Sequence, residues 1–377
     1  MNFKNKRRLI LLCFIFLAGS LTVFSLINLW QEEKNSYFHP PILPKNSQEG
    51  IITVGEIIMS TTEGYNWWSY VPMTLGKSDN AYILLEMSHA QSEDYLTLTN
   101  DARQNVVNWI SYAELRKYII VTAAVPRNFS AGYYPQGINV HSLNSSTPEF
   151  YYRPDLKVNS IISELKNNLT DAGYTPAEKI LVAGFSAGGM WANRYTLLHP
   201  EKVLAAAMGQ AGGWLAMPLS EYNGSLLNWP MGLHNFHNLT GNYYNKTEIL
   251  KEVPQFIYIG DLDTSSTYCN EGYPYCDNIT IWGTTDPERI ENQYNYLEEH
   301  DYKVQFKLYE GYGHTYNYII KNDVMDFFDS IIRSGEDGTI PGFELFIILP
   351  IILLSVIILD YIRQKNNSYS LMTGGGR

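Results

Sequence analysis

The sequence is poor in charged residues and has no excess of positive charge. Charged residues make up 17% of its 377 positions and hydrophobic residues 45%, which allows a large core and excludes a highly charged, disordered chain. Its 27 basic side chains are outnumbered by 38 acidic ones, so the net charge is −11. A protein that binds nucleic-acid phosphates needs a basic face. We therefore expect no nucleic-acid partner.

Cysteine is almost absent, which limits the disulfides and metal sites that the chain can form. Of three cysteines, Cys13 lies in an apolar run, so Cys269 and Cys276 are the only pair in a polar segment. Two cysteines are too few for a structural zinc site, but they can form a disulfide in an oxidising compartment. His234 and His237 have metal-ligand spacing without a third ligand nearby. We predict a Cys269–Cys276 disulfide and no metal.

Two long apolar runs stand out from the rest of the sequence. Residues 9–30 and 343–362 are each about 20 residues long, enough to cross a bilayer core of roughly 30 Å as a helix. Basic residues flank the two runs on the sides of the chain ends, at Lys4, Lys6, Arg7, Arg8, Arg363 and Lys365. The positive-inside rule then predicts that both termini are cytoplasmic and that everything between the runs is extracellular. The first run is alternatively a cleaved signal peptide, with Ala18, Gly19 and Ser20 as its processing site.

Two other features agree with an external position of the central part. Acceptor motifs for N-glycosylation occur at Asn128, Asn144, Asn168, Asn223, Asn238, Asn245 and Asn278. At the start of the second run, Ile340–Phe343 resembles the short Pro-Gly-Phe signature that precedes the C-terminal anchors of archaeal surface proteins. We therefore expect a glycoprotein held at the cell membrane.

Between the two runs, short apolar segments alternate with amphipathic ones. The strand candidates are Tyr82–Met87, Tyr118–Ala124, Lys179–Ala183, Val203–Met208, Gln255–Ile259 and Val304–Tyr309. Most are nearly continuous in apolar residues, as strands covered on both faces are, whereas the last alternates and is expected near an edge. Helices are predicted at Asp155–Leu169, at about 286–300 and at Tyr318–Ile332. The alternation predicts an α/β fold with a doubly wound, mostly parallel sheet, interrupted by a small cap insertion at about 212–252.

The motif with the clearest chemistry is Gly184–Gly189, which contains Gly-x-Ser-x-Gly around Ser186. It follows an apolar strand candidate and precedes the helical run 190–199, and a nucleophile elbow requires this strand–turn–helix context. Gly184 and Gly188 are expected because such a turn is too tight for side chains beside the serine. The turn places the Ser186 hydroxyl at a helix N-terminus, where developing negative charge is favoured. Ser186 is the predicted nucleophile.

A serine hydroxyl needs a general base, and the base needs a carboxylate that orients it. In a fold with such an elbow, the order along the chain is nucleophile, acid, histidine. His314 lies in a loop just past the last strand candidate, whereas His199 and His300 lie at helix ends, so His314 is the predicted base. Asp261 and Asp263 directly follow the preceding strand candidate, and both are possible acids. A short turn towards the histidine favours Asp263.

The oxyanion of the tetrahedral intermediate needs backbone donors. One is expected from the residue after the nucleophile, Ala187, and a second from the loop after an earlier strand. That strand candidate ends at Met87, and the loop continues as Ser88–Gln91. Gln91 is our first choice for the second donor, and Ala90 is the next.

Several short motifs spread over roughly residues 65–332 occur together in one known family. They are Trp68–Pro72, Pro126–Arg127, Gly184–Gly189, Asn193–Tyr195, His199–Pro200, Val253–Gln255 and Gly260–Asp263. Together they resemble the esterase and polyhydroxyalkanoate-depolymerase branch of the α/β hydrolases. This resemblance implies ester hydrolysis through an acyl-enzyme without a cofactor, and it implies Asp263 as the acid rather than Asp261. Many relatives have His-Gly where this chain has His89-Ala90, which leaves the second oxyanion donor open.

The sequence thus predicts a membrane-anchored, extracellular serine hydrolase that cleaves a small-molecule or polymeric ester. Its expected parts are an anchor or signal peptide (1–30), a stalk (31–50), an α/β-hydrolase domain (51–335), a C-terminal transmembrane helix (340–363) and a cytoplasmic tail (364–377). Two other functions compete with this one. The first is a surface peptidase of the prolyl-oligopeptidase kind, and the second is a catalytically silent, glycan-binding surface protein. The oligomeric state stays open.

Overall fold

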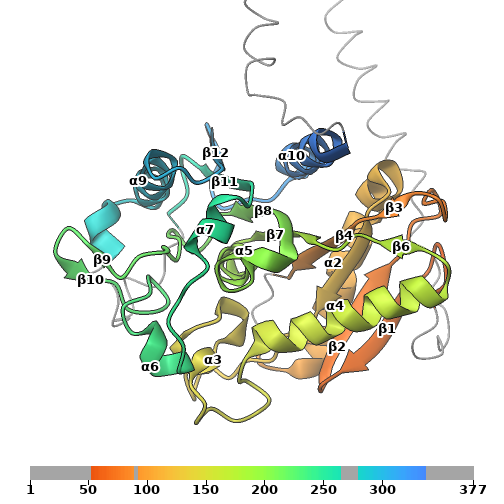
Figure 1. Cartoon of the computed structure of the whole chain (residues 1–377), viewed down its shortest axis with the longest axis horizontal. Helices are drawn as coiled ribbons and strands as arrows, with labels where there is room; N and C mark the ends of the chain where they lie inside the picture. The colour runs from red at the N-terminus through yellow and green to blue at the C-terminus, as the bar shows by residue number, and fades with distance from the viewer. Residues whose placement is uncertain (1–51, 89–91, 265–278, 337–377) are drawn as a thin grey trace, which may run out of the picture. The chain divides into compact units, whose positions relative to one another are not determined.

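The computed structural model describes residues 52–88, 92–264 and 279–336, and an eight-stranded sheet runs through this part of the chain (Figure 1). In spatial order its strands are β1 (Ile57–Thr62), β2 (Tyr65–Tyr70), β5 (Ile119–Ala123), β4 (Ile83–Met87), β7 (Ile180–Phe185), β8 (Val203–Gly209), β11 (Gln255–Gly260) and β12 (Val304–Tyr309). β2 pairs antiparallel with β1 and β5, and the other neighbouring strands are parallel. The predicted doubly wound, mostly parallel sheet is confirmed.

The predicted strands are all present, with ends that agree with the prediction to within two residues. β12 lies at one edge of the sheet, as its alternating sequence predicts. The hairpin of β1 and β2 was not predicted. Its tight turn at Glu63 and Gly64 has φ angles of 49° and 81°, the left-handed conformations that two-residue hairpin turns use.

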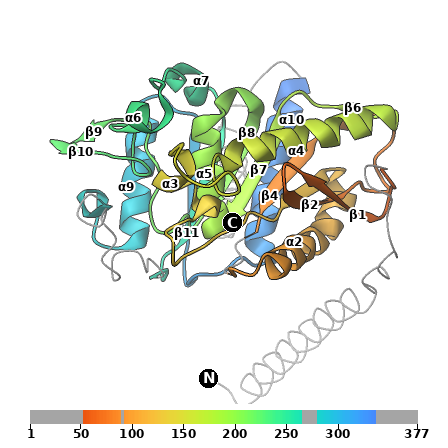
Figure 2. The same ribbon diagram turned by 90° about the horizontal axis from the view of Figure 1, so that it is seen from below.

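Helices cover both faces of the sheet. One face packs against α4 (Pro154–Asp171), α5 (Ala187–Leu198) and α9 (Asp286–Glu299), and the other packs against α2 (Tyr95–Arg116) and α10 (Tyr318–Glu336). Figure 2 shows β2 and β4 between α2 and α4. This coverage explains why the central strands are almost wholly apolar, since a parallel strand must be buried on both sides.

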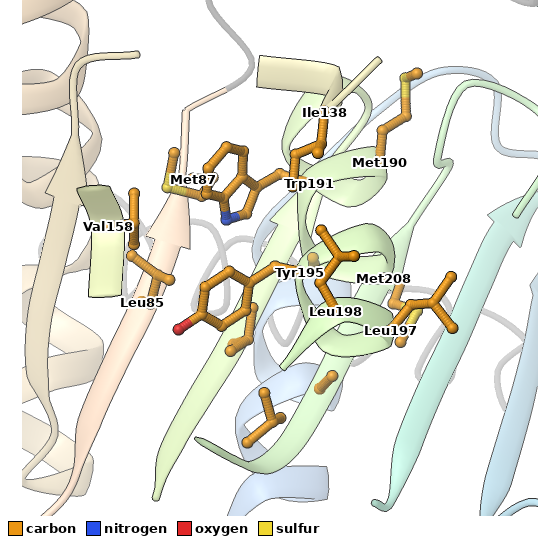
Figure 3. Packing of buried hydrophobic residues seen from close by; sticks show 14 of the residues in the cluster. Leu85, Met87, Ile138, Val158, Met190, Trp191, Tyr195, Leu197, Leu198 and Met208 are labelled. Atoms are coloured by element: carbon orange, nitrogen blue, oxygen red, sulfur yellow. The ribbon is translucent and has the colours of Figure 1, made fainter. Parts of the chain in front are cut away.

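The helix that follows Ser186, α5, is the most deeply buried helix near the predicted site. Its Trp191 and Tyr195 are 0% and 1% exposed, and they point towards Leu85, Met87 and Val158 (Figure 3). A buried side chain of that size stabilises a fold by roughly 3 kcal/mol or more. The packing therefore fixes α5, and with it the elbow, against the strand that leads into the predicted oxyanion loop.

The segment between β8 and β11 contains the predicted cap insertion. It includes a small antiparallel ribbon and two short helices, β9 (Glu221–Tyr222), β10 (Ser225–Leu226), α6 (Phe236–Thr240) and α7 (Thr247–Lys251). The remaining short elements are β3 (Asn80–Ala81), β6 (Thr175–Pro176), α3 (Val140–Leu143), η1 (Pro135–Gly137), η2 (Pro200–Lys202) and η4 (Thr280–Trp282). That the inserted segment covers the site as a cap stays a prediction.

Several predictions concern residues outside the described ranges. Both predicted membrane spans, the stalk, Gln91, and the cysteines of the predicted disulfide lie there. Within residues 52–88, 92–264 and 279–336, no helix is both long and apolar enough to span a membrane.

A buried ion cluster joins the start of α4 to the end of α5. The side chain of Asp155 is 0% exposed and accepts hydrogen bonds from Arg153 Nη2 at 2.6 Å and from His199 Nε2 at 2.8 Å. Burial alone raises the pKa of Asp155, but the bonds from His199 and Arg153 outweigh it and lower the pKa to about 2. Because the ordinary pKa is 3.8, this pairing stabilises the fold above about pH 4 and is lost as the pH falls towards 2.

Asp155→Asn is expected to lower the free energy of unfolding at pH 7 by about 3 kcal/mol, because it leaves the partly exposed Arg153 and the buried His199 without their carboxylate. The difference from wild type should shrink as the pH is lowered from 5 to 2.5, since wild type alone loses the pairing. Urea unfolding at several pH values measures this. Asp171→Asn, an exposed carboxylate at the other end of α4, is the control. A constant difference between Asp155→Asn and wild type across this pH range would contradict the account.

Candidate active site

Ser186 lies at the junction between β7 and α5, in a strained turn. Its φ and ψ are 57° and −121°, values that a residue with a side chain adopts only at a cost. Two hydrogen bonds hold the turn: the Ser186 amide donates to Gly209 O at 2.9 Å, and its carbonyl accepts from the Met190 amide at 2.9 Å. Ser186 remains partly exposed, so its hydroxyl is accessible from outside the sheet.

The glycines around Ser186 have no room for side chains. A Cβ at Gly184 would lie 2.0 Å from Gly188 O, and one at Gly188 would lie 2.2 Å from Met87 O, the end of β4. At Gly189 a Cβ would lie 2.3 Å from the carbonyl oxygen of the last residue of β8. The elbow therefore sits against two neighbouring strands, and only glycine permits this approach.

His314 lies in the loop between β12 and α10, and the structure brings it to Ser186. Its Nε2 is 2.9 Å from Ser186 Oγ, although the two residues are 128 positions apart in the sequence. The ring also packs on Phe185, the residue before the serine, with ring centroids 4.8 Å apart. An imidazole in this position can accept the hydroxyl proton of the serine.

Asp263 provides the carboxylate behind the histidine. Its Oδ2 is 3.0 Å from His314 Nδ1, and its side chain is 2% exposed, whereas that of His314 is 33% exposed. The alternative acid, Asp261, has a different role, since its Oδ1 accepts a hydrogen bond from the Gly311 amide at 2.7 Å. The turn after β11 thus directs Asp263 towards the histidine and Asp261 towards the histidine loop.

Ser186, His314 and Asp263 are placed so that a proton can pass from the serine hydroxyl to the imidazole. A buried carboxylate fixes the tautomer in which Nδ1–H points to Asp263 and Nε2 carries a free lone pair towards the serine. The same carboxylate can stabilise the imidazolium that would form if Ser186 gave its proton to His314. The geometry therefore suits a serine activated for attack on an electrophilic carbonyl.

Only one of the two predicted oxyanion donors lies in the described part of the chain. Ala187 is the first residue of α5, so its amide is not used within the helix and is available to a developing negative charge. Gln91 lies outside the described residues, but the start of its loop is fixed. Gln136, which is 3% exposed, donates its side-chain amide to Ser88 O. Gln136 lies in no recognisable motif, so its contact with this loop could not be predicted.

Solved structures match this fold, although no family model and no curated protein matches the sequence. The structure of poly(aspartic acid) hydrolase-1 from Sphingomonas sp. KT-1 is similar with a TM-score of 0.51 and 18% sequence identity, over 74% of this chain and 98% of that one. The chain has the α/β-hydrolase fold.

Two other solved structures are similar at lower scores. Poly(3-hydroxybutyrate) depolymerase from Bordetella parapertussis is 17% identical, with a TM-score of 0.48 over 77% of this chain and 93% of that one. Acetyl xylan esterase from Aspergillus awamori is 16% identical, with a TM-score of 0.42 over 72% of this chain and 100% of that one. At these identities the similarities concern the fold, and the chemistry has to be argued from the site.

This α/β-hydrolase fold also buries a carboxylate in strand β4 that no sequence motif indicated. Glu86 is 1% exposed in the middle of the sheet, and Asn105 Nδ2 donates a hydrogen bond to it. Burial raises the pKa of Glu86 well above its usual range, and the nearby charge of Lys321 opposes that rise. A glutamate inside the otherwise apolar strand β4 was the signal that could have revealed it.

Over residues 52–88, 92–264 and 279–336, no group of three or more His, Cys, Asp or Glu side chains is arranged to hold a metal ion. His237 instead stacks on Tyr243, with ring centroids 4.0 Å apart.

Proposed function

We propose that this chain is a serine hydrolase that cleaves carboxylic esters through a Ser186–His314–Asp263 triad. The observation that carries the proposal is the pair of contacts on His314, 2.9 Å to Ser186 Oγ and 3.0 Å to Asp263 Oδ2. These distances lie within the range that nucleophile, base and orienting acid need. The strained elbow at Ser186 supports the same role, because strain of this kind gathers at functional sites.

In the first half of the reaction, Ser186 Oγ attacks the carbonyl carbon of the ester while His314 Nε2 takes the hydroxyl proton. The bond from carbon to the leaving oxygen then breaks, and His314 returns the proton to that oxygen to release an alcohol. Asp263 stays ionised throughout and stabilises the imidazolium. The product of this half is an ester of Ser186 with the acyl group.

In the second half, water replaces the alcohol. His314 takes a proton from the water as its oxygen attacks the acyl carbon, and it then returns the proton to Ser186 Oγ as the acid leaves. In both halves the carbonyl oxygen becomes negative. The Ala187 amide at the start of α5 is the first proposed donor to that oxyanion, and Gln91 remains our proposed second donor.

We also propose that the domain is extracellular and anchored in the cell membrane, with cytoplasmic termini. This rests on the apolar runs 9–30 and 343–362, their basic flanks and the glycosylation motifs between them. Of the predicted glycosylation sites, Asn144 is partly exposed and Asn238 is exposed, as sugar attachment requires.

The test of the proposed reaction is a substrate comparison with the purified full-length chain in detergent. We expect turnover of p-nitrophenyl acetate and butyrate at rates far above those for peptide p-nitroanilides. Faster cleavage of the peptide anilides than of the esters would favour the surface-peptidase alternative. No turnover of either class by the folded protein would contradict hydrolysis and favour the glycan-binding alternative.

A further inference from the structure

The loop that carries His314 is held by a side chain from the strand next to the nucleophile. Gln210 directly follows β8, and its Nε2 donates a hydrogen bond to Gly313 O at 2.9 Å. That carbonyl belongs to the peptide bond that joins Gly313 to His314. The contact therefore acts on the backbone immediately before the proposed base, across 103 positions of sequence.

The backbone around Gln210 is tied to the other two parts of the site. Its amide donates to Tyr258 O at 2.9 Å, on β11, the strand that leads to Asp263. The carbonyl of the residue before it, Gly209, accepts the Ser186 amide at 2.9 Å. Gln210 thus lies where the segments that carry nucleophile, acid and base meet.

The conformation of Gln210 indicates that its side chain has a use. Its φ of 43° is left-handed, a conformation that glycine adopts without strain and glutamine does not. The residue is 2% exposed, and its Oε1 is buried with no hydrogen-bond partner in the part of the chain that the structure describes. The buried side chain of Gln210 therefore contributes one contact, the hydrogen bond that its amide nitrogen donates to Gly313 O.

Other contacts hold the earlier part of the histidine loop without Gln210. The Leu262 amide donates to Tyr312 O at 2.9 Å, and Asp261 Oδ1 accepts the Gly311 amide at 2.7 Å. If the glutamine amide is lost, the loop stays attached at these points. The Gly313 carbonyl then loses the hydrogen bond that fixes its direction next to His314.

We propose that Gln210 is a positioning residue for the proposed triad. By holding the Gly313–His314 peptide, it keeps His314 Nε2 aligned with Ser186 Oγ. The inference rests on the proposed function, since it assigns Gln210 to the same reaction. Gln210 acts through His314 and contacts no reacting atom.

Gln210→Met tests this in the full-length chain, because methionine keeps the length of the side chain and removes the donor. We expect kcat for p-nitrophenyl acetate to fall roughly 10- to 100-fold, the effect of a misplacement of about 1 Å, with little change in KM. The rate of fluorophosphonate labelling should fall in parallel. Gln210→Gly, which relaxes the left-handed backbone, should show the same loss and answers the question if the methionine variant does not fold.

Gln210→Glu adds a readout that a purely structural role does not move. An ionised glutamate cannot donate to Gly313 O, whereas a protonated one can. The ratio of kcat for Gln210→Glu to kcat for Gln210→Met should therefore rise as the pH is lowered. A ratio that stays constant with pH would count against the donated hydrogen bond.

The control is Gln293→Met, which alters another fully buried glutamine. Its side chain bonds both the amide and the carbonyl of Leu215, at 2.7 and 2.9 Å. We expect this variant to lower the unfolding temperature and to keep kcat. If Gln210→Met lost no more kcat than Gln293→Met, the positioning role of Gln210 would be overturned. The proposed ester hydrolysis would not be affected by that result. A wild-type chain without ester turnover or labelling would overturn the proposed function, and this inference with it.

Discussion

Ser186→Ala is expected to lower kcat/KM for p-nitrophenyl acetate by roughly 10⁴- to 10⁶-fold and to leave the thermal unfolding curve unchanged. The reason is that the acyl-enzyme cannot form without Oγ, while the loss of one oxygen leaves the elbow intact. The hydrogen bonds that hold the turn come from the backbone of Ser186, to Gly209 and from Met190, and alanine keeps both.

The matched control for this variant is Ser163→Ala. Ser163 is an exposed serine on α4, and its hydroxyl donates to Asn159 O within the helix. Its replacement is expected to leave kcat/KM within about twofold of wild type, since surface changes of this kind are nearly neutral. Esterase kinetics and thermal unfolding of both variants check the prediction. Activity of Ser186→Ala at the level of Ser163→Ala would show that another group is the nucleophile.

Asp263→Asn has the second largest expected effect, a fall in kcat of about 10⁴-fold. An asparagine amide in this position donates to His314 Nδ1 instead of accepting from it. The imidazole proton then lies on Nε2, which can no longer take the proton of Ser186, 2.9 Å away. The shape of the side chain is unchanged, so the fold and substrate binding should be preserved.

Asp261→Asn is the control, because it changes the other carboxylate of the same turn and leaves Asp263 in place. The two residues share one turn, but within the described residues the Asp261 carboxylate accepts a hydrogen bond from the Gly311 amide and none from His314, and an asparagine carbonyl can accept the same bond. We expect kcat to stay within about threefold of wild type, since one neutral acceptor replaces another outside the triad. If Asp261→Asn lost as much activity as Asp263→Asn, the assignment of the acid would be wrong.

The parts of the site that follow from short local patterns could be predicted from the sequence. The elbow around Ser186 is recognisable because strand, glycine turn and helix are contiguous. His314 is recognisable because it lies directly after a strand that alternates at the sheet edge. The distances between Ser186, His314 and Asp263 could not be predicted from such patterns, since they depend on how β7, β11 and β12 align.

Helix α2 and the β1–β2 hairpin were not predicted, because their sequences show no clear periodicity of hydrophobic residues. α2 buries polar residues such as Thr99 and Asn105 beside its apolar ones, so its sequence shows no simple apolar stripe. The β1–β2 hairpin turns at Glu63 and Gly64, and glutamate is not a residue that predicts a left-handed turn.

Gln210 and Glu86 could not be assigned from the sequence for a different reason. Each depends on a residue that is distant in sequence: Gln210 donates a hydrogen bond to Gly313, and the charge of Lys321 acts on the pKa of Glu86. A single glutamine after a strand belongs to no recognisable sequence motif. Its contact with the histidine loop is known only from the positions of the neighbouring strand ends. Residues that position a catalytic group are therefore harder to predict than the group itself.

The most direct test of the central claim is labelling of the full-length chain with a fluorophosphonate probe, followed by peptide mapping. The account predicts a single modified serine, Ser186, with labelling that is lost in His314→Ala because an unassisted hydroxyl reacts slowly with such probes. Labelling at a different residue, or no labelling of the well-folded protein, would contradict the account.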